Sequence, residues 1–452
     1  MWIVGFLLVL GPLVTLHELG HYLVGRWFGV KADSFSVGFG SEIAGFTDRR
    51  GTRWKLASLP LGGYVQFAGD MNPASQPSDE WLNLPPAERA RTFQAKPLWQ
   101  RALIVAAGPL TNFAIAVLII AGFAMAHGIP LGVPKVIEFS NPSDARLAGV
   151  EVGDVITKVD GHSIDNFNEI PQYVAIRGGQ TISLTIDRDG RRIEVPVKLR
   201  RQILRDEFGN QSQIGDLGIG FSPAKIGAIL AKSPAKKAGL ETGDQIVSLN
   251  GTPIHGFFGL STLIQDRPGQ TVTIGVVRQG RPWLFPIRLD SVPAIDAKGR
   301  KVQIGQLGVG TAEDVASVGP FAAMAVGWQQ SVITLKTEAL GVWQILTGQR
   351  STKELGGPLK IAKFSGEQLS LGWRSFVSFV ALISINLAFI NLLPIPALDG
   401  GHLAFYAAEA VRRKPASPRS QEWAFRTGIA FVLALMLFVT INDIVSLPIF
   451  GS

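Results

Sequence analysis

Long apolar runs divide the chain into four segments that could each cross a bilayer, which takes about 20 apolar residues. We predict membrane-spanning helices at 1–28, 99–127, 371–402 and 424–448. The first has neither the basic start nor the small-residue cleavage site of a signal peptide, so we expect it to be retained. The pattern therefore predicts a polytopic α-helical membrane protein with four transmembrane helices.

Between the first two spans, the segment 29–98 changes to alternating apolar and polar positions. Residues 34–67 are rich in glycine, and 48–51 read as a turn between two strands. We predict a β-hairpin layer there, followed by a short helix near 85–91. The exposed edge of such a hairpin could accept an extended peptide, or the layer could only pack against the helices.

The segment between the second and third spans contains an internal repeat. Six landmarks recur 90 residues later, which indicates a duplicated domain at 128–212 and 213–312. The landmarks are Gly149, Gly153, Asp154, Gly161, Gln180 and Arg188, followed by Gly239, Gly243, Asp244, Gly251, Gln270 and Arg278. Each copy resembles a PDZ domain, and we assign the loop 215–220 to the second copy as its carboxylate-binding loop. Such modules could bind peptide ends, or only restrict access by their bulk.

Composition and charge narrow the choice of partners. Of 452 residues, 46% are hydrophobic and 17% charged, and the net charge of +8 suits anionic lipid headgroups. The chain lacks an aromatic-interleaved basic stripe, so nucleic acid is not expected as a partner. It has no cysteine, so a metal would have to be bound by His, Asp or Glu.

Basic residues in the short connecting segments set the expected orientation. They are concentrated in 29–98 and in the predicted loop 403–423, which we therefore place in the cytoplasm. The stretch 128–370 would then lie outside the inner membrane, with both chain ends on that side. Its last part, 313–370, is a separate external region.

The first predicted span carries the triplet His17, Glu18 and His21. On a helix, positions i and i+4 share one face, so both imidazoles can bind one metal while the glutamate remains free as a base. Ionisable groups within a bilayer are costly and usually functional, although the histidines could instead bond to neighbouring helices. A catalytic zinc ion needs a third protein ligand and an open position for water.

The third ligand is expected at the end of the third span. Asp399 follows Pro394 and Pro396 and precedes two glycines, which let its backbone leave helical geometry and approach a metal. His402 is a rival ligand by residue type, and we expect it to be structural or to support the ligands.

Three asparagines are candidate substrate contacts. Asn386 and Asn391 lie in the third span, where an amide can bond an extended backbone or only a neighbouring helix. Asn112 lies four residues after Gly108, so the two share a helix face. Simple helix packing would explain that pair equally well.

Taken together, these motifs resemble those of the site-2 protease family of intramembrane zinc metalloproteases. The quoted segments are His17–His21, Gly38–Gly40, Pro60–Val65, Lys96–Arg101 with Ala107–Pro109, Gly357–Pro358 and Asn391–Gly401. The resemblance implies one Zn²⁺ per chain held by His17, His21 and Asp399, with Glu18 as catalytic base. It implies that Asn391, and also Asn386, contact substrate.

The resemblance also implies an architecture and partners. It implies a multi-pass protein of the bacterial inner membrane with a membrane-associated β-hairpin layer and two tandem periplasmic PDZ domains. Substrates would be single-span membrane proteins of the anti-sigma-factor type and signal-peptide remnants, and 313–370 would hold amphipathic helices. A membrane-anchored PDZ scaffold with a non-catalytic metal site is the alternative. A transporter would need inverted repeats among the spans, and we find none.

Overall fold

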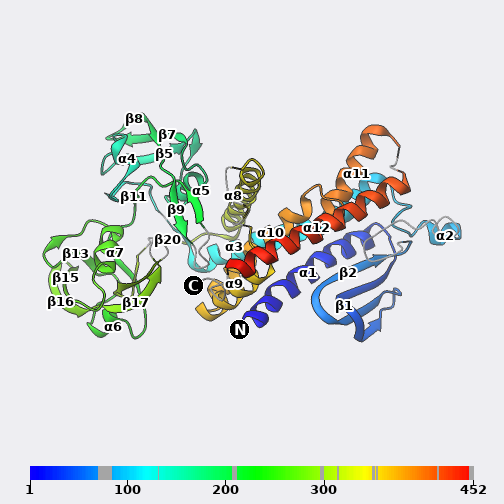
Figure 1. The fold of residues 1–452 in the computed structure, drawn as a ribbon, viewed down its shortest axis with the longest axis horizontal. Helices are drawn as coiled ribbons and strands as arrows, with labels where there is room; N and C mark the ends of the chain where they lie inside the picture. The colour runs from blue at the N-terminus through cyan, green and yellow to red at the C-terminus, as the bar shows by residue number, and fades with distance from the viewer. Residues whose placement is uncertain are drawn as a thin grey trace. The chain divides into compact units, whose positions relative to one another are not determined.

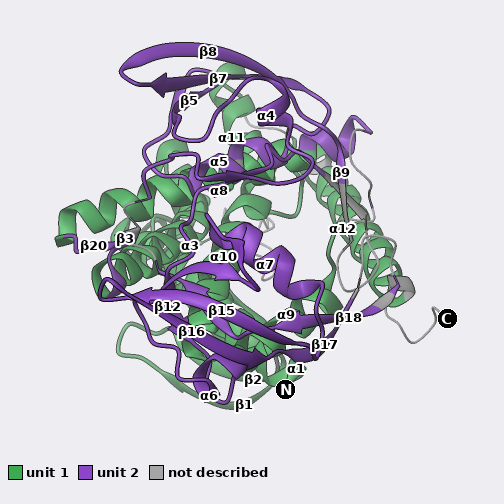
Figure 2. Ribbon diagram, turned by 90° about the vertical axis from the view of Figure 1, so that its left-hand side faces the viewer, with its two compact units in different colours: residues 1–126, 319–342, 355–452 green, residues 127–318, 343–354 purple. Residues whose placement is uncertain are grey.

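The computed structural model describes residues 1–69, 84–130, 132–205, 211–295, 300–312, 315–348, 352, 355–414 and 417–446. They form two compact units, coloured separately in Figure 2. Unit 1 contains residues 1–126, 319–342 and 355–452, and unit 2 contains 127–318 and 343–354. Each unit therefore combines segments that are distant in sequence.

Four helices of unit 1 are long and apolar enough to cross a membrane. They are Trp2–Trp27, Leu98–His127, Trp373–Leu392 and Ser420–Ile444. The first three are α1, α3 and α10, and the fourth lies within α12 (Pro418–Ser446). By length and composition, these helices agree with the four predicted spans, and the chain is a membrane protein.

The third predicted span is not one continuous helix. Helix α10 ends at Leu392, and α11 (Asp399–Arg412) begins after a break that contains both prolines (Figure 1). Proline lacks the backbone donor that a continuing helix needs, which explains the break. The interpretation of 403–423 as a loop was wrong, because it contains most of α11. Unit 1 also contains α2 (Pro86–Arg89), α9 (Pro358–Leu371) and all but the last four residues of α8 (Pro320–Leu346).

An antiparallel hairpin follows α1. Its strands β1 (Ala32–Thr47) and β2 (Arg53–Phe67) pair from Ala32 with Phe67 to Thr47 with Arg53. The half near α1 is anchored in a buried cluster with Tyr22, Phe35 and Ile104. From Gly40 to Thr47, β1 is exposed. The base of the hairpin is thus rigidly attached to the helices that carry the site.

Unit 2 contains two modules with the same order of sheet strands. The first has the sheet β6-β5-β7-β8, and the second has β14-β13-β15-β16. Each module has its own buried apolar cluster, with Leu184 fully buried in one and Ile274 in the other. The 90-residue repeat is therefore a repeat of folded units.

The elements of unit 2 have the following bounds. In the first module they are β3 (Ile129–Pro130), β4 (Glu138–Phe139), α4 (Asp144–Leu147), β5 (Val155–Val159), β6 (His162–Ser163), α5 (Glu169–Ala175), β7 (Thr181–Arg188), β8 (Arg191–Lys198), β9 (Gln202–Arg205), β10 (Gln211–Ile214) and β11 (Ile219–Gly220). In the second module and after it they are β12 (Ile226–Ile229), α6 (Pro234–Lys237), β13 (Gln245–Leu249), β14 (Thr252–Pro253), α7 (Phe257–Gln265), β15 (Thr271–Arg278), β16 (Arg281–Arg288), β17 (Asp290–Ile295), β18 (Lys301–Gln306), β19 (Val309–Thr311) and β20 (Val315–Ala316).

The loop 215–220 belongs to the first module, so our assignment of it to the second was wrong. Leu217 is buried in the first module's apolar cluster, and its carbonyl accepts hydrogen bonds from Ser143 and from the Ala145 backbone. Strand β11 pairs with β4 of the same module. A segment at the C-terminal end of each module therefore completes its fold, and the spacing of the landmarks does not reveal this.

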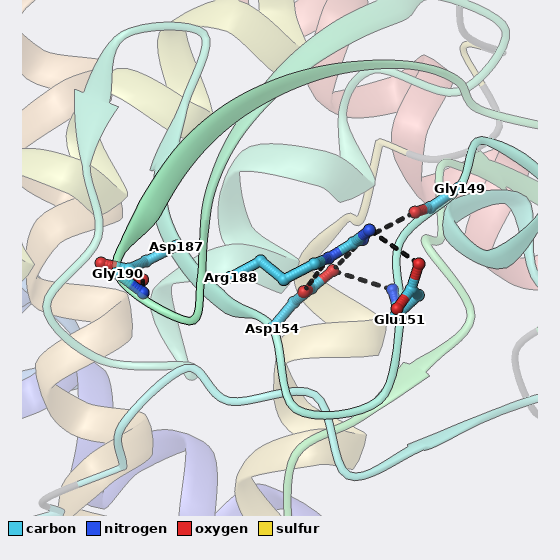
Figure 3. A network of polar contacts seen from close by, with 6 residues as sticks. All are labelled: Gly149, Glu151, Asp154, Asp187, Arg188 and Gly190. Carbon is cyan, nitrogen blue, oxygen red and sulfur yellow. Dashed lines mark hydrogen bonds and ion pairs between the residues drawn. The ribbon is translucent and has the colours of Figure 1, made fainter.

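An ion-pair network around a buried aspartate fixes a loop in each module. In Figure 3, the Arg188 guanidinium donates to both oxygens of Asp154, at 2.7 and 2.8 Å, and to Glu151 and the Gly149 carbonyl. Asp154 is only 1% exposed. Burial raises the pKa of Asp154, but the hydrogen bonds from Arg188 and from the Glu151 backbone outweigh it, so the pKa lies below its ordinary value. The same network recurs around Arg278 and Asp244.

Candidate metal centre

Helix α1 presents two buried imidazoles on one face. His17 and His21 are one turn apart, and their Nε2 atoms are 3.2 Å from each other. An i, i+4 spacing produces this arrangement on any α-helix. The two ring nitrogens therefore face a common point, as the sequence predicted.

Asp399 is brought to the same point from the other end of the chain. One of its carboxylate oxygens lies 3.1 Å from His17 Nε2 and 3.5 Å from His21 Nε2. Asp399 is the first residue of α11, and Ala397 before it has a φ of 94°. The following Gly400 and Gly401 lie against the Leu392 and Ile395 carbonyls, where a Cβ would come within 2.4 Å. This close packing holds the start of α11 beside the end of α10.

The donor set fits a zinc ion. Two imidazole nitrogens and a carboxylate oxygen are the donors of many catalytic zinc sites. Donors placed about 2.0–2.1 Å from a tetrahedral ion are about 3.3 Å from one another, and the three separations here are 3.1, 3.2 and 3.5 Å. The Asp399 oxygen is also buried without a hydrogen-bond partner in the described structure. A cation would satisfy it.

Helix α3 orients both imidazoles through their other nitrogens. His21 Nδ1 lies 2.8 Å from the Ile104 carbonyl. Because a carbonyl can only accept a hydrogen bond, the proton of the neutral imidazole is on Nδ1, and the lone pair of Nε2 is free to bind a metal. The Asn112 amide lies 3.2 Å from His17 Nδ1. Turning this amide over, which needs no extra space, presents its oxygen to an Nδ1–H. Both histidines are then in the tautomer that binds metal through Nε2.

The role predicted for Asn112 needs correction. Its side chain is fully buried behind His17, at 0% exposure, so a substrate cannot reach it. Asn112 does share a helix face with Gly108, but its amide points to the metal-binding residue His17 and not into open space. Gly108 itself packs directly on the histidines, since an added Cβ would lie 2.3 Å from His21 Nε2.

Glu18 lies beside the metal ligands and is held by the hairpin. Its carboxylate accepts a hydrogen bond of 3.1 Å from the Val65 backbone of β2. Glu18 lines the same cavity as the three ligand residues. The hairpin therefore fixes the direction of this carboxylate without occupying the metal position.

The open side of the centre is a cavity of about 210 Å³. Asn391 lines it, together with His402, Tyr406, Phe93 and others. Asn386 is not among the lining residues: it is half-buried on α10, and its amide donates to the Leu382 carbonyl one turn earlier. Among the described residues, the group that could hold a metal ion contains Asp399 and not His402.

Two contributors to the site were not found from the sequence. They are backbone groups, the Ile104 carbonyl and the Val65 N–H. Every residue carries such groups, so the residue type does not indicate which of them will contact the site. Tyr406 and Phe93 were also missed, because the contacts that bring them to the cavity connect segments far apart in sequence.

Comparisons with known proteins agree with this chemistry. The profile of Peptidase family M50 matches residues 5–435. A protein of Agrobacterium fabrum named as a zinc metalloprotease is 36% identical, over 99% of this chain and 96% of its own length. The regulator of sigma-E protease RseP of Escherichia coli is 32% identical, over 98% of each chain. A solved PDZ domain of an SdrC-like protein from Listeria monocytogenes is 22% identical over 20% of this chain and 88% of its own, with a TM-score of 0.17.

Proposed function

The chain belongs to peptidase family M50, and we propose that one zinc ion per chain, held by His17, His21 and Asp399, is the catalytic centre of this intramembrane zinc metalloprotease. The observation that carries the proposal is the meeting of three donors from α1 and α11 within 3.1–3.5 Å of one another. A binding scaffold would have no need for Glu18 beside them. The enzyme class itself follows from the family.

A zinc ion held by His17, His21 and Asp399 would supply Lewis acidity, which would polarise a peptide carbonyl and lower the pKa of water to near neutrality. Glu18 takes the proton from the attacking water and passes it to the leaving amine. The Val65 N–H holds the Glu18 carboxylate in one orientation for both transfers. Phe67, Phe93 and Val105 contribute apolar surface to the cavity that Glu18 lines.

Substrates are membrane proteins, and we propose the single-span, anti-sigma-factor type and signal-peptide remnants. A helical substrate must unwind, because its carbonyls are engaged in helix bonds. The unwound segment would pair with an edge of the β1–β2 hairpin and be contacted by Asn391, which lines the cavity. The position of Asn386 outside this cavity makes it the weaker candidate.

The two modules of unit 2 are proposed to be PDZ domains on the periplasmic side of the inner membrane. The basic segment 29–98 would face the cytoplasm together with the hairpin, and the hairpin would be membrane-associated. The modules would bind the exposed end of a substrate or exclude substrates that are too large.

The Glu18→Gln variant tests this function against a PDZ scaffold. We expect it to retain one zinc per chain but to lose cleavage of a single-span substrate in detergent or liposomes. Glu88→Gln, at an exposed position on α2, is the matched control and should cleave normally. Normal cleavage by the Glu18 variant would reject the mechanism, and zinc-independent cleavage by the unmodified protein would reject the centre.

A further inference from the structure

One face of α3 supports the metal centre along most of the first half of the helix. Arg101, Ile104, Gly108 and Asn112 follow one another at spacings of three or four residues and so share this face. Asn112 contacts His17 and the Ile104 carbonyl contacts His21, so two of the three ligands each have a partner on this face. The remaining member, Arg101, contacts α11, the helix that begins with the third ligand.

Helix α11 has a corresponding face. Asp399, His402, Tyr406 and Glu409 are again separated by three or four residues, and the first three line the cavity. The helix cannot inherit its direction from α10, because the chain between them is non-helical from Leu393 to Leu398. Something must therefore fix the far end of α11 if its first residue is to meet the histidines.

Arg101 makes three contacts that can do this. Its Nη2 lies 2.8 Å from a Glu409 carboxylate oxygen, and its guanidinium lies over the Tyr406 ring, 5.0 Å from the centroid. Its Nε donates to the Lys96 carbonyl, which restrains the guanidinium from the other side. The two side chains of the ion pair are only 15% and 18% exposed, so water and salt screen them less than a surface pair.

We propose that Arg101 is a positioning residue for the zinc centre, which acts by holding Glu409 and Tyr406 so that α11 presents Asp399 to His17 and His21. This inference rests on the zinc site proposed above. Glu409 lies ten residues after Asp399, which is about 15 Å along a helix. Over that length a tilt of about 4° moves one end by about 1 Å, whereas metal–ligand distances vary by only about 0.2 Å.

The test compares zinc binding in Arg101→Gln, Glu409→Gln and the double variant of the full-length protein. Chelator competition gives the zinc affinity, and the visible spectrum of the Co²⁺-substituted protein reports the ligand geometry. We expect each single variant to lose about tenfold or more in zinc affinity, within the range for groups that orient metal ligands, and to change the Co²⁺ spectrum. The double variant should bind zinc no more weakly than Arg101→Gln alone, because Glu409 acts through Arg101.

Two further variants separate positioning from general stability. Arg426→Gln breaks the exposed Arg426–Glu422 pair on α12 and should leave zinc affinity unchanged. Arg101→Lys keeps the charge but loses the planar group over Tyr406, so it should recover part of the affinity. If Arg101→Gln does not fold, the exchange Arg101→Glu with Glu409→Arg should restore folding and zinc affinity together.

The inference and the proposed function fail in different ways. If the unmodified protein binds no zinc that depends on His17, the proposed centre is wrong. If it binds that zinc, but Arg101→Gln keeps the same affinity and Co²⁺ spectrum, only the role of Arg101 is overturned. A lower melting temperature with unchanged zinc binding, or a folded charge exchange without recovered affinity, would likewise overturn it.

Discussion

Replacing Gly108 by alanine tests how closely α3 packs on the metal ligands. A Cβ at this position would lie 2.3 Å from His21 Nε2 and 2.6 Å from His17 Nε2. These atoms are the two imidazole donors of the proposed zinc site. Alanine is the smallest possible probe, and it favours a helix more than glycine does.

The magnitude follows from the contact distances. Ordinary carbon contacts begin near 3.5 Å, so the His21 ring would have to move by roughly 1 Å. Metal–ligand distances tolerate only about 0.2 Å. We therefore expect zinc affinity to fall by at least ~10–100-fold, as for other changes that misorient ligands. Cleavage at saturating zinc should fall by about 100-fold, the cost of a comparable misplacement of reacting groups.

The assay is zinc affinity by chelator competition, followed by substrate cleavage at saturating zinc. Gly122→Ala is the control on the same helix, because an added Cβ there meets no atom within 4 Å. It should bind zinc and cleave like the unmodified protein. If Gly108→Ala binds zinc with unchanged affinity, the histidines do not hold the metal where the structure places them, and the reasoning is refuted.

Asn112→Leu keeps the branched shape but removes the amide that orients His17, so we expect ~10–100-fold weaker zinc binding by chelator competition; unchanged affinity would leave Asn112 a packing residue. Arg188→Gln removes the guanidinium that donates to both oxygens of Asp154, so we expect a lower melting temperature at pH 7 than for the unmodified protein. Since the pKa of Asp154 is lowered in the folded state, this stabilisation is present above its ordinary pKa near 3.9 and is lost as pH falls through the lower folded value. The gap between the two melting temperatures should thus close in acid, and a gap that widens there would contradict the assignment.

The sequence predicts the elements that can be recognised from the pattern of apolar and polar residues within one segment. The four apolar spans and the strands of 34–67 are visible because burial in lipid or on one sheet face imposes a period on neighbouring residues. The histidine pair was predicted for the same reason, since helical spacing alone places both rings on one face. Asp399 was predicted from backbone freedom, and the structure places it beside the rings.

What the sequence could not predict depends on contacts between distant segments. The role of Asn112 was misread because helix spacing identifies a face but not the side chain that it meets. The loop 215–220 was placed in the wrong module because a repeat defines a period but not where each folded copy begins. The segment 403–423 was read as a cytoplasmic loop from its basic residues, which indicate the side of the membrane but not the local structure, and most of α11 lies within it.

The central claim is that α1 and α11 bind one zinc ion within the apolar helices. Anomalous diffraction at the zinc edge, from crystals of the full-length protein, locates such an ion directly. The account predicts one peak about 2.0–2.2 Å from His17 Nε2, His21 Nε2 and an Asp399 carboxylate oxygen. A peak coordinated by other residues, with Asp399 turned away from both histidines, would contradict it.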